Sequence, residues 1–162
     1  MRTRGTFLAR AAWPLLVAGA LAGWGGTTPA GAADAGTTTQ VSISGTVSGA
    51  PESVAFSGTA SINSRLAPDP DFGNHKVVLI VDLRSVSGVG AATQTKYVIS
   101  GPDIMHRHLG AADMVNITFP FAPAGSTGVG DARSGLASFA LSFDVNTGAV
   151  TAATAAVGTP SP

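Results

Sequence analysis

Apolar and hydroxyl-bearing residues alternate with a period of two in the segments 41–48 and 53–62. Successive side chains of a β-strand point to opposite faces, so each segment predicts a strand with one buried face and one face rich in serine and threonine. Gly49-Ala50-Pro51 lies between the two segments and predicts a tight turn, which makes the pair a β-hairpin. The apolar positions of the hairpin are Val41, Ile43, Val47, Val54, Phe56, Ala60 and Ile62.

Further strands are predicted along the rest of the chain. Val77–Val81 is apolar at every position, which is typical of a strand covered on both faces, and we expect it to be the central strand. Asn146-Thr147-Gly148 has the residues of a short hairpin turn between the last two strands. The strands predicted after the first hairpin are 77–81, 94–100, 114–121, 136–145 and 149–157.

The strand pattern predicts the fold class. Beyond the N-terminal region we find no segment with apolar residues spaced i, i+3 and i+4, as a helix would need. About seven strands joined by glycine- and proline-rich connections predict an all-β domain, a single antiparallel β-sandwich or alternatively a small β-barrel. We expect this domain to span 41–157, with a flexible leader at 33–40 and a disordered tail at 158–162.

The N-terminal region has the three parts of a secretory signal peptide. Arg2, Arg4 and Arg10 precede the apolar stretch Ala11–Trp24, and Ala30-Gly31-Ala32 follows as a small-residue cleavage site. The apolar stretch contains proline and glycine and is shorter than the roughly 20 residues that a membrane-spanning helix needs. We therefore expect residues 1–32 to be removed, with cleavage after Ala33 as an alternative, and the protein to be periplasmic or extracellular.

Composition narrows the function classes. The chain has no cysteine, so an exported domain must be held by packing and hydrogen bonds alone. After cleavage, six basic side chains remain against nine acidic ones, which is a net charge of −3. A sparsely charged, mildly acidic surface argues against nucleic acid as a partner and against anionic lipid head groups.

Three connections are longer than an ordinary hairpin turn: 63–75, 101–113 and 122–135. If every strand reverses direction, alternate connections emerge at the same end of the domain. The first two connections, which contain every histidine of the chain, then share one end, and the small-residue connection 122–135 lies at the other. We expect any ligand site to lie on 63–75 and 101–113.

A metal site is one hypothesis for this end. His106 and His108 stand two residues apart, so on an extended chain both imidazoles lie on one face. His75, Asp69 and Asp71 lie on the other long connection and complete the candidate ligand set. Imidazole with the thioethers of Met105 and Met114 would suit copper, and imidazole with carboxylate would suit zinc. A solvated pair of histidines is the competing interpretation, under which no metal or other cofactor binds.

Other chemistry has less support in the sequence. Asp69-Pro70-Asp71-Phe72-Gly73-Asn74 begins like a calcium loop, but it lacks the glutamate at the twelfth position, and two aspartate-proline turns explain it as well. No serine lies in a G-x-S-x-G elbow, so the sequence leans away from an enzyme. Glu52, in the first turn, is expected to be solvated, and Gly88-Val89-Gly90 to be a flexible connection.

The function predicted from sequence is therefore an exported module that acts by binding a small ligand or a protein partner. Two alternatives stay open: a periplasmic copper- or zinc-binding protein, and a structural subunit that self-assembles. The second follows from the segments 41–48 and 149–157, which carry no lysine or glutamate and would, as sheet edges, leave the chain free to form a homo-oligomer by strand pairing.

Overall fold

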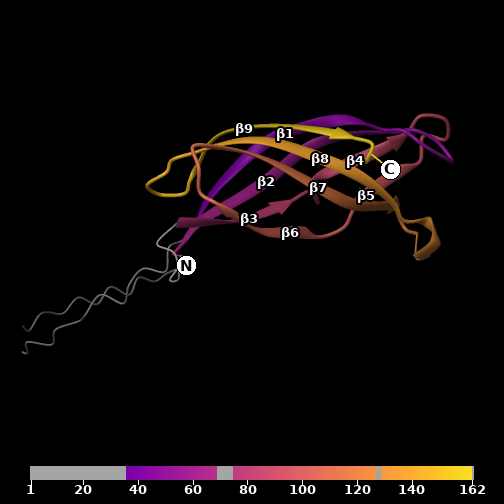
Figure 1. The fold of residues 1–162 in the computed structure, drawn as a ribbon. Helices are drawn as coiled ribbons and strands as arrows, with labels where there is room; N and C mark the ends of the chain where they lie inside the picture. The colour runs from indigo at the N-terminus through magenta and orange to yellow at the C-terminus, as the bar shows by residue number, and fades with distance from the viewer. Residues whose placement is uncertain (1–35, 69–74, 127–128, 162) are drawn as a thin grey trace, which may run out of the picture. The chain divides into compact units, whose positions relative to one another are not determined.

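A computed structural model of the chain describes residues 36–68, 75–126 and 129–161, all within the compact unit Ala32–Pro162 (Figure 1). These residues form strands and one short 3₁₀ segment, η1 (Val129–Asp131), so the all-β prediction is confirmed. The strands are β1 (Thr37–Val47), β2 (Val54–Pro68), β3 (His75–Asp82), β4 (Val86–Gly90), β5 (Lys96–Ile99), β6 (Pro102–His108), β7 (Ala112–Pro123), β8 (Arg133–Phe143) and β9 (Val150–Gly158).

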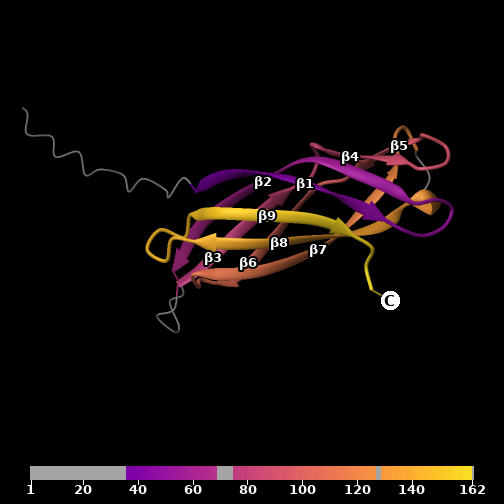
Figure 2. The ribbon, with the colours of Figure 1, turned by 90° about the horizontal axis from the view of Figure 1, so that it is seen from above.

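The sheet closes on itself through its first strand. The strand order is β1-β9-β8-β7-β5-β4-β2-β3-β6, and β1 also pairs antiparallel with β2 from Thr37 to Val47. On its other side β1 runs parallel to β9, with Gly45 opposite Val157 (Figure 2). A Cβ atom on Gly45 would collide with the carbonyl oxygen of Val157, so only glycine permits this close approach. The closed order gives the barrel-like form of the predicted fold.

Two pairs of strands lie end to end along the barrel. β3 and β4 both pair with β2, and between them Leu83, Arg84 and Ser85 lie opposite only Thr59 and Ala60. Three residues opposite two is a β-bulge. β6 pairs with β3, and β5 pairs with β4. β5 and β6 therefore also lie end to end, as β3 and β4 do. The nine strands are thus seven long ones, two of them interrupted.

The inward side chains form one apolar core. Phe56 packs edge-to-face against Phe119 and Phe121, with ring centroids 5.6 and 4.9 Å apart, and Tyr97 packs against Phe121 at 5.7 Å. The apolar positions predicted for the first hairpin are all in this core, as is the aligned set of β7 and β8. The aligned set comprises Val115, Ile117, Phe119, Phe121, Phe139, Leu141 and Phe143, whereas Val145, predicted to share the face of Phe143, lies beyond the end of β8 and is 50 % exposed.

Several boundaries differ from the sequence predictions. The connections 63–75 and 101–113 are shorter than expected, because β2 continues to Pro68 and β6 occupies Pro102–His108. Gly88-Val89-Gly90 is part of β4 and is not a flexible connection. β1 begins at Thr37, inside the segment expected to be a leader.

The predicted edges also differ. β1 pairs with β2 and β9, and β9 pairs with β8 and β1, so the expectation of free edges at 41–48 and 149–157 is wrong. β3 is not the central strand either, because only β6 follows it in the strand order. The strand that ends the order, and therefore forms an edge of the sheet, is β6.

Candidate functional site

The barrel has two ends with contrasting chemistry. At the histidine end, His75 pairs with Pro68 and His108 with Lys76, so the end of β2, the start of β3 and the end of β6 lie side by side, as the strand count predicted. The glutamate end, at the other end of the barrel, comprises residues 48–53, 91–95, 124–126 and 129–132. Arg133 and Glu52 join the elements there, since the guanidinium donates to the backbone oxygen of Glu52.

The histidines do not all share one face. His106 lies opposite Val78 and His108 opposite Lys76, so both imidazoles are on the outer face of β6, where they are exposed. His75 precedes Lys76 in β3 and so belongs to the alternate face. Met105 packs against the core, whereas Met114 is 61 % exposed on β7.

Part of the candidate metal set lies outside the described residues, namely Asp69 and Asp71. Within 36–68, 75–126 and 129–161, no three histidine or acidic side chains are grouped as a metal ion would require. The site of His75, His106, His108, Asp69 and Asp71 therefore stays a sequence prediction.

A small recess does lie at the histidine end. It has a volume of about 250 Å³ and is lined by His106, Arg107, His108, Ala112 and Asp113. The Arg107 guanidinium binds the Asp113 carboxylate through two hydrogen bonds, Nε to Oδ2 at 2.7 Å and Nη2 to Oδ1 at 2.8 Å. This pair lowers the pKa of Asp113. We call this hollow the histidine recess.

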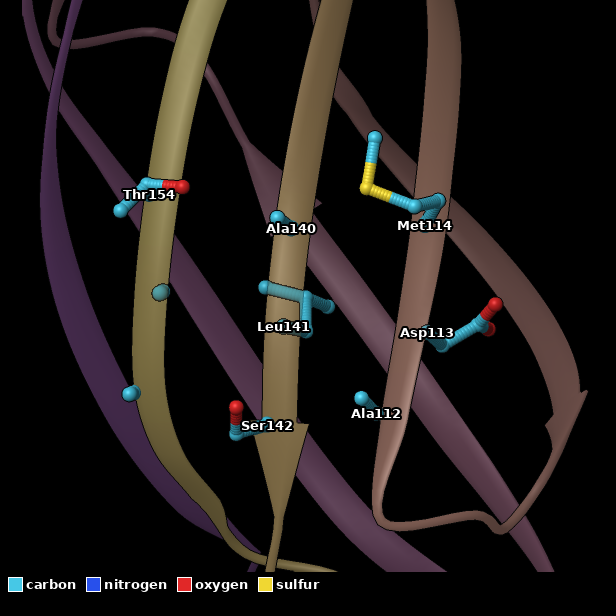
Figure 3. Close-up of a pocket in the computed structure, with 9 residues that line it drawn as sticks. Ala112, Asp113, Met114, Ala140, Leu141, Ser142 and Thr154 are labelled. Carbon is cyan, nitrogen blue, oxygen red and sulfur yellow. The ribbon is translucent and has the colours of Figure 1, made fainter.

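A larger hollow follows on the outer face of β7, β8 and β9. This trough has a volume of about 520 Å³ and shares Ala112 and Asp113 with the histidine recess. Figure 3 shows Met114 on the β8 side of β7, while Asp113 points away from the trough. The cross-strand row Met114–Ala140–Thr154 forms part of its floor. Its remaining lining is Leu141, Ser142, Ala152 and Ala153, so Asp113 is the single charged residue in the lining.

At the glutamate end, the Glu52 carboxylate accepts four hydrogen bonds from neighbouring residues. Glu52 is 9 % exposed and accepts hydrogen bonds from the amides of Ala92 and Thr93, at 2.8 and 3.0 Å. The hydroxyls of Thr93 and Tyr97 donate at 2.6 and 3.1 Å. The hydrogen bonds from Thr93, above all from its hydroxyl, lower the pKa of Glu52 to about 2. The expectation that Glu52 is solvated is wrong.

The surroundings of Glu52 fit a structural role. Arg133 donates to the carbonyl oxygens of Glu52 and Gly49 and lies 5.1 Å from the ring centre of Phe121. Burial, followed by the hydrogen bond to Glu52, raises the pKa of Tyr97. Every buried side-chain oxygen or nitrogen among the described residues has a partner.

The described residues contain no helix of the length and apolarity that would cross a membrane. Comparison of the chain with family models, with curated proteins and with solved structures finds no match to any of the three.

Proposed function

We propose that the chain is exported and acts as a binding module, with the trough over β7, β8 and β9 as the site of an apolar or aromatic small molecule. The observation that carries this proposal is a hollow of about 520 Å³ that presents alanines, Met114 and the hydroxyls of Ser142 and Thr154, since the Leu141 side chain is buried in the core and Asp113 points away from the trough. Ligand sites of proteins are mostly apolar, have a few polar groups, and fall within roughly 300–1,000 Å³.

The chemistry of the lining selects the ligand class. Ser142 and Thr154 offer hydroxyls to a ligand that carries a hydrogen-bonding group. Asp113 is already neutralised by Arg107, so the trough offers no free charge to attract an ionic ligand. A neutral, flat apolar molecule therefore matches the site better than an anion or a metal ion.

Binding is tested with the neutral fluorophore N-phenyl-1-naphthylamine. We expect its emission to rise on addition of the protein, with one probe per chain, and the affinity to be unchanged between about 0.05 and 0.5 M salt, since no charge takes part. Ala140→Arg places a guanidinium in the middle of the trough and should weaken binding at least about tenfold.

The matched control is Ser57→Arg, which adds the same side chain to the exposed face of β2, away from the trough. Both variants should keep the circular dichroism spectrum of the parent. Equal probe binding by Ala140→Arg and the parent would disprove the assignment of the trough.

Export is tested separately. When the complete sequence is expressed in a bacterial host, we expect the protein outside the cytoplasm, with Ala33 as its first residue and Asp34 as the alternative. The proposal rests on the basic, apolar and small-residue segments within residues 1–32. N-terminal sequencing decides it, and an intact precursor in the cytoplasm would contradict it.

A further inference from the structure

We propose that the molecule bound in the trough is a long-chain amphiphile whose alkyl tail lies along the trough and whose carboxylate head group lies in the histidine recess. This inference rests on the proposed function, because it specifies the class of ligand for the same trough. The first observation is that the trough and the histidine recess are continuous, since Ala112 and Asp113 line both of them. A ligand in the trough can therefore extend past β7 toward β6.

The histidine recess is rich in hydrogen-bond donors. His106 and His108 line it, and each imidazole has at least one N–H donor in either protonation state. Arg107 binds the Asp113 carboxylate through Nε and Nη2, which leaves the N–H groups of Nη1 for a ligand. Because both Asp113 oxygens already accept hydrogen bonds from Arg107, the recess suits a carboxylate, which only accepts, better than an ammonium group, which only donates.

The trough also continues in the opposite direction, into a second hollow over β8 and β9. The second hollow has a volume of about 370 Å³ and shares Met114, Ala140 and Thr154 with the trough (Figure 3). It extends to Ala156, and none of the described residues that line it is charged. The chemistry along the three hollows therefore runs from polar at one end to apolar at the other, as it does along an amphiphile.

The length of this path fits a long alkyl chain. Ala112 pairs with Ser142, which pairs with Ala152, and Ala156 lies four residues further along β9. Two strand spacings and four residues place Ala112 and Ala156 roughly 16 Å apart. The trough has no free charge, so the neutral part of the ligand lies within it and the carboxylate lies beyond Ala112, in the histidine recess.

Displacement of N-phenyl-1-naphthylamine tests the head group. Dodecanol is a more apolar competitor than dodecanoate, so the trough alone would favour the alcohol. With the carboxylate in the recess, dodecanoate should instead displace the probe at a concentration about tenfold lower than dodecanol. The double variant His106→Ala/His108→Ala should lose this preference while it keeps its affinity for the neutral probe. The control is His75→Ala, on the alternate face at the same end and outside the recess, which should retain the preference.

Ala156→Arg tests the direction of the tail. A guanidinium at the far end of the second hollow should weaken the binding of hexadecanoate at least about tenfold. Decanoate, with its carboxylate in the recess, is too short to reach this position and should bind the variant and the parent equally. Tighter binding of hexadecanoate by the variant would place the carboxylate at the opposite end and overturn the proposal.

The outcomes separate this inference from the proposed function. Each variant should keep the circular dichroism spectrum of the parent. A parent protein that does not bind the neutral probe would overturn both the proposed function and the amphiphile. Probe binding with equal displacement by dodecanoate and dodecanol, or a preference that survives in the double histidine variant, would overturn the amphiphile alone and leave the trough as a site for neutral apolar molecules.

Discussion

The two ends of the barrel use polar residues in opposite ways. At the glutamate end, the Glu52 carboxylate is enclosed by four donors from one neighbouring turn and strand. At the histidine end, His106 and His108 are exposed on a strand that pairs on one side only. A buried charge with every hydrogen bond satisfied fixes the fold, whereas exposed imidazoles on the outer face of a strand remain accessible to solvent and ligands.

Among the substitutions that compare the two ends, Glu52→Ala should lower the thermal stability of the protein most. Loss of this carboxylate leaves the buried Tyr97 hydroxyl and the partly buried amides of Ala92 and Thr93 without their acceptor. We expect the greatest fall in Tm of the variants considered. Asp82→Ala is the control, because its carboxylate binds the exposed Arg84 on the surface. A Tm for Glu52→Ala equal to that of the control would contradict a stabilising role of the Glu52 hydrogen bonds.

A glycine pair compares the packing of the two ends. A Cβ on Gly90 would collide with the Glu52 carboxylate, whereas the nearest atom to a Cβ on Gly110 is 3.6 Å away. Gly90→Ala should therefore cost about 1–3 kcal/mol of unfolding free energy, as overpacked sites do. Gly110→Ala should stay within about 0.5 kcal/mol of the parent. Urea unfolding measures both, and equal costs would remove the contrast.

The stability of the protein at acid pH should depend on the ionisation of Glu52. Its folded-state pKa, about 2, lies below the ordinary 4.5, so its contribution to stability is complete above pH 4.5 and is lost as pH falls toward 2. The stability difference between the parent and Glu52→Gln should be constant above pH 4.5 and shrink below it. Chemical unfolding at a series of pH values measures this difference. A constant difference down to pH 2 would show that the carboxylate's charge is not what stabilises this end.

The smallest effect is expected at the histidines. His106→Ala and His108→Ala remove exposed imidazoles and should change stability by less than about 0.5 kcal/mol. Titration of the parent and the double variant with copper or zinc, followed by native mass spectrometry, tests the metal hypothesis. A stoichiometric adduct that the double variant loses would support it, and its absence in the parent would end it.

Much of the fold follows from local pattern. Seven segments predicted from the sequence correspond to seven of the nine strands of the described residues, and in most of them inward apolar residues such as Phe119 and Phe139 repeat at every second position. β4 was missed because two of its three inward residues are Gly88 and Gly90, where Phe56 and Glu52 fill the space of a side chain. That information comes from packing against another strand.

The features of the candidate site that the sequence did not predict also depend on contacts between distant parts of the chain. β6 was read as part of a loop because six of its seven residues are exposed, as an edge strand permits. Glu52 was read as solvated because its donors lie 40 and more residues further along the chain. The trough depends on how the small outward residues of β7, β8 and β9 align across strands, which a single strand's pattern does not contain.

The pairing of β1 with β9 has a kinetic consequence. The barrel is closed by the pairing of Gly45 in β1 with Val157 in β9. It therefore cannot close until nearly all of the chain has been synthesised. Contacts of such long sequence separation form slowly. If the chain is exported as proposed, a molecule crossing a translocation channel would stay unclosed until its last hairpin emerges.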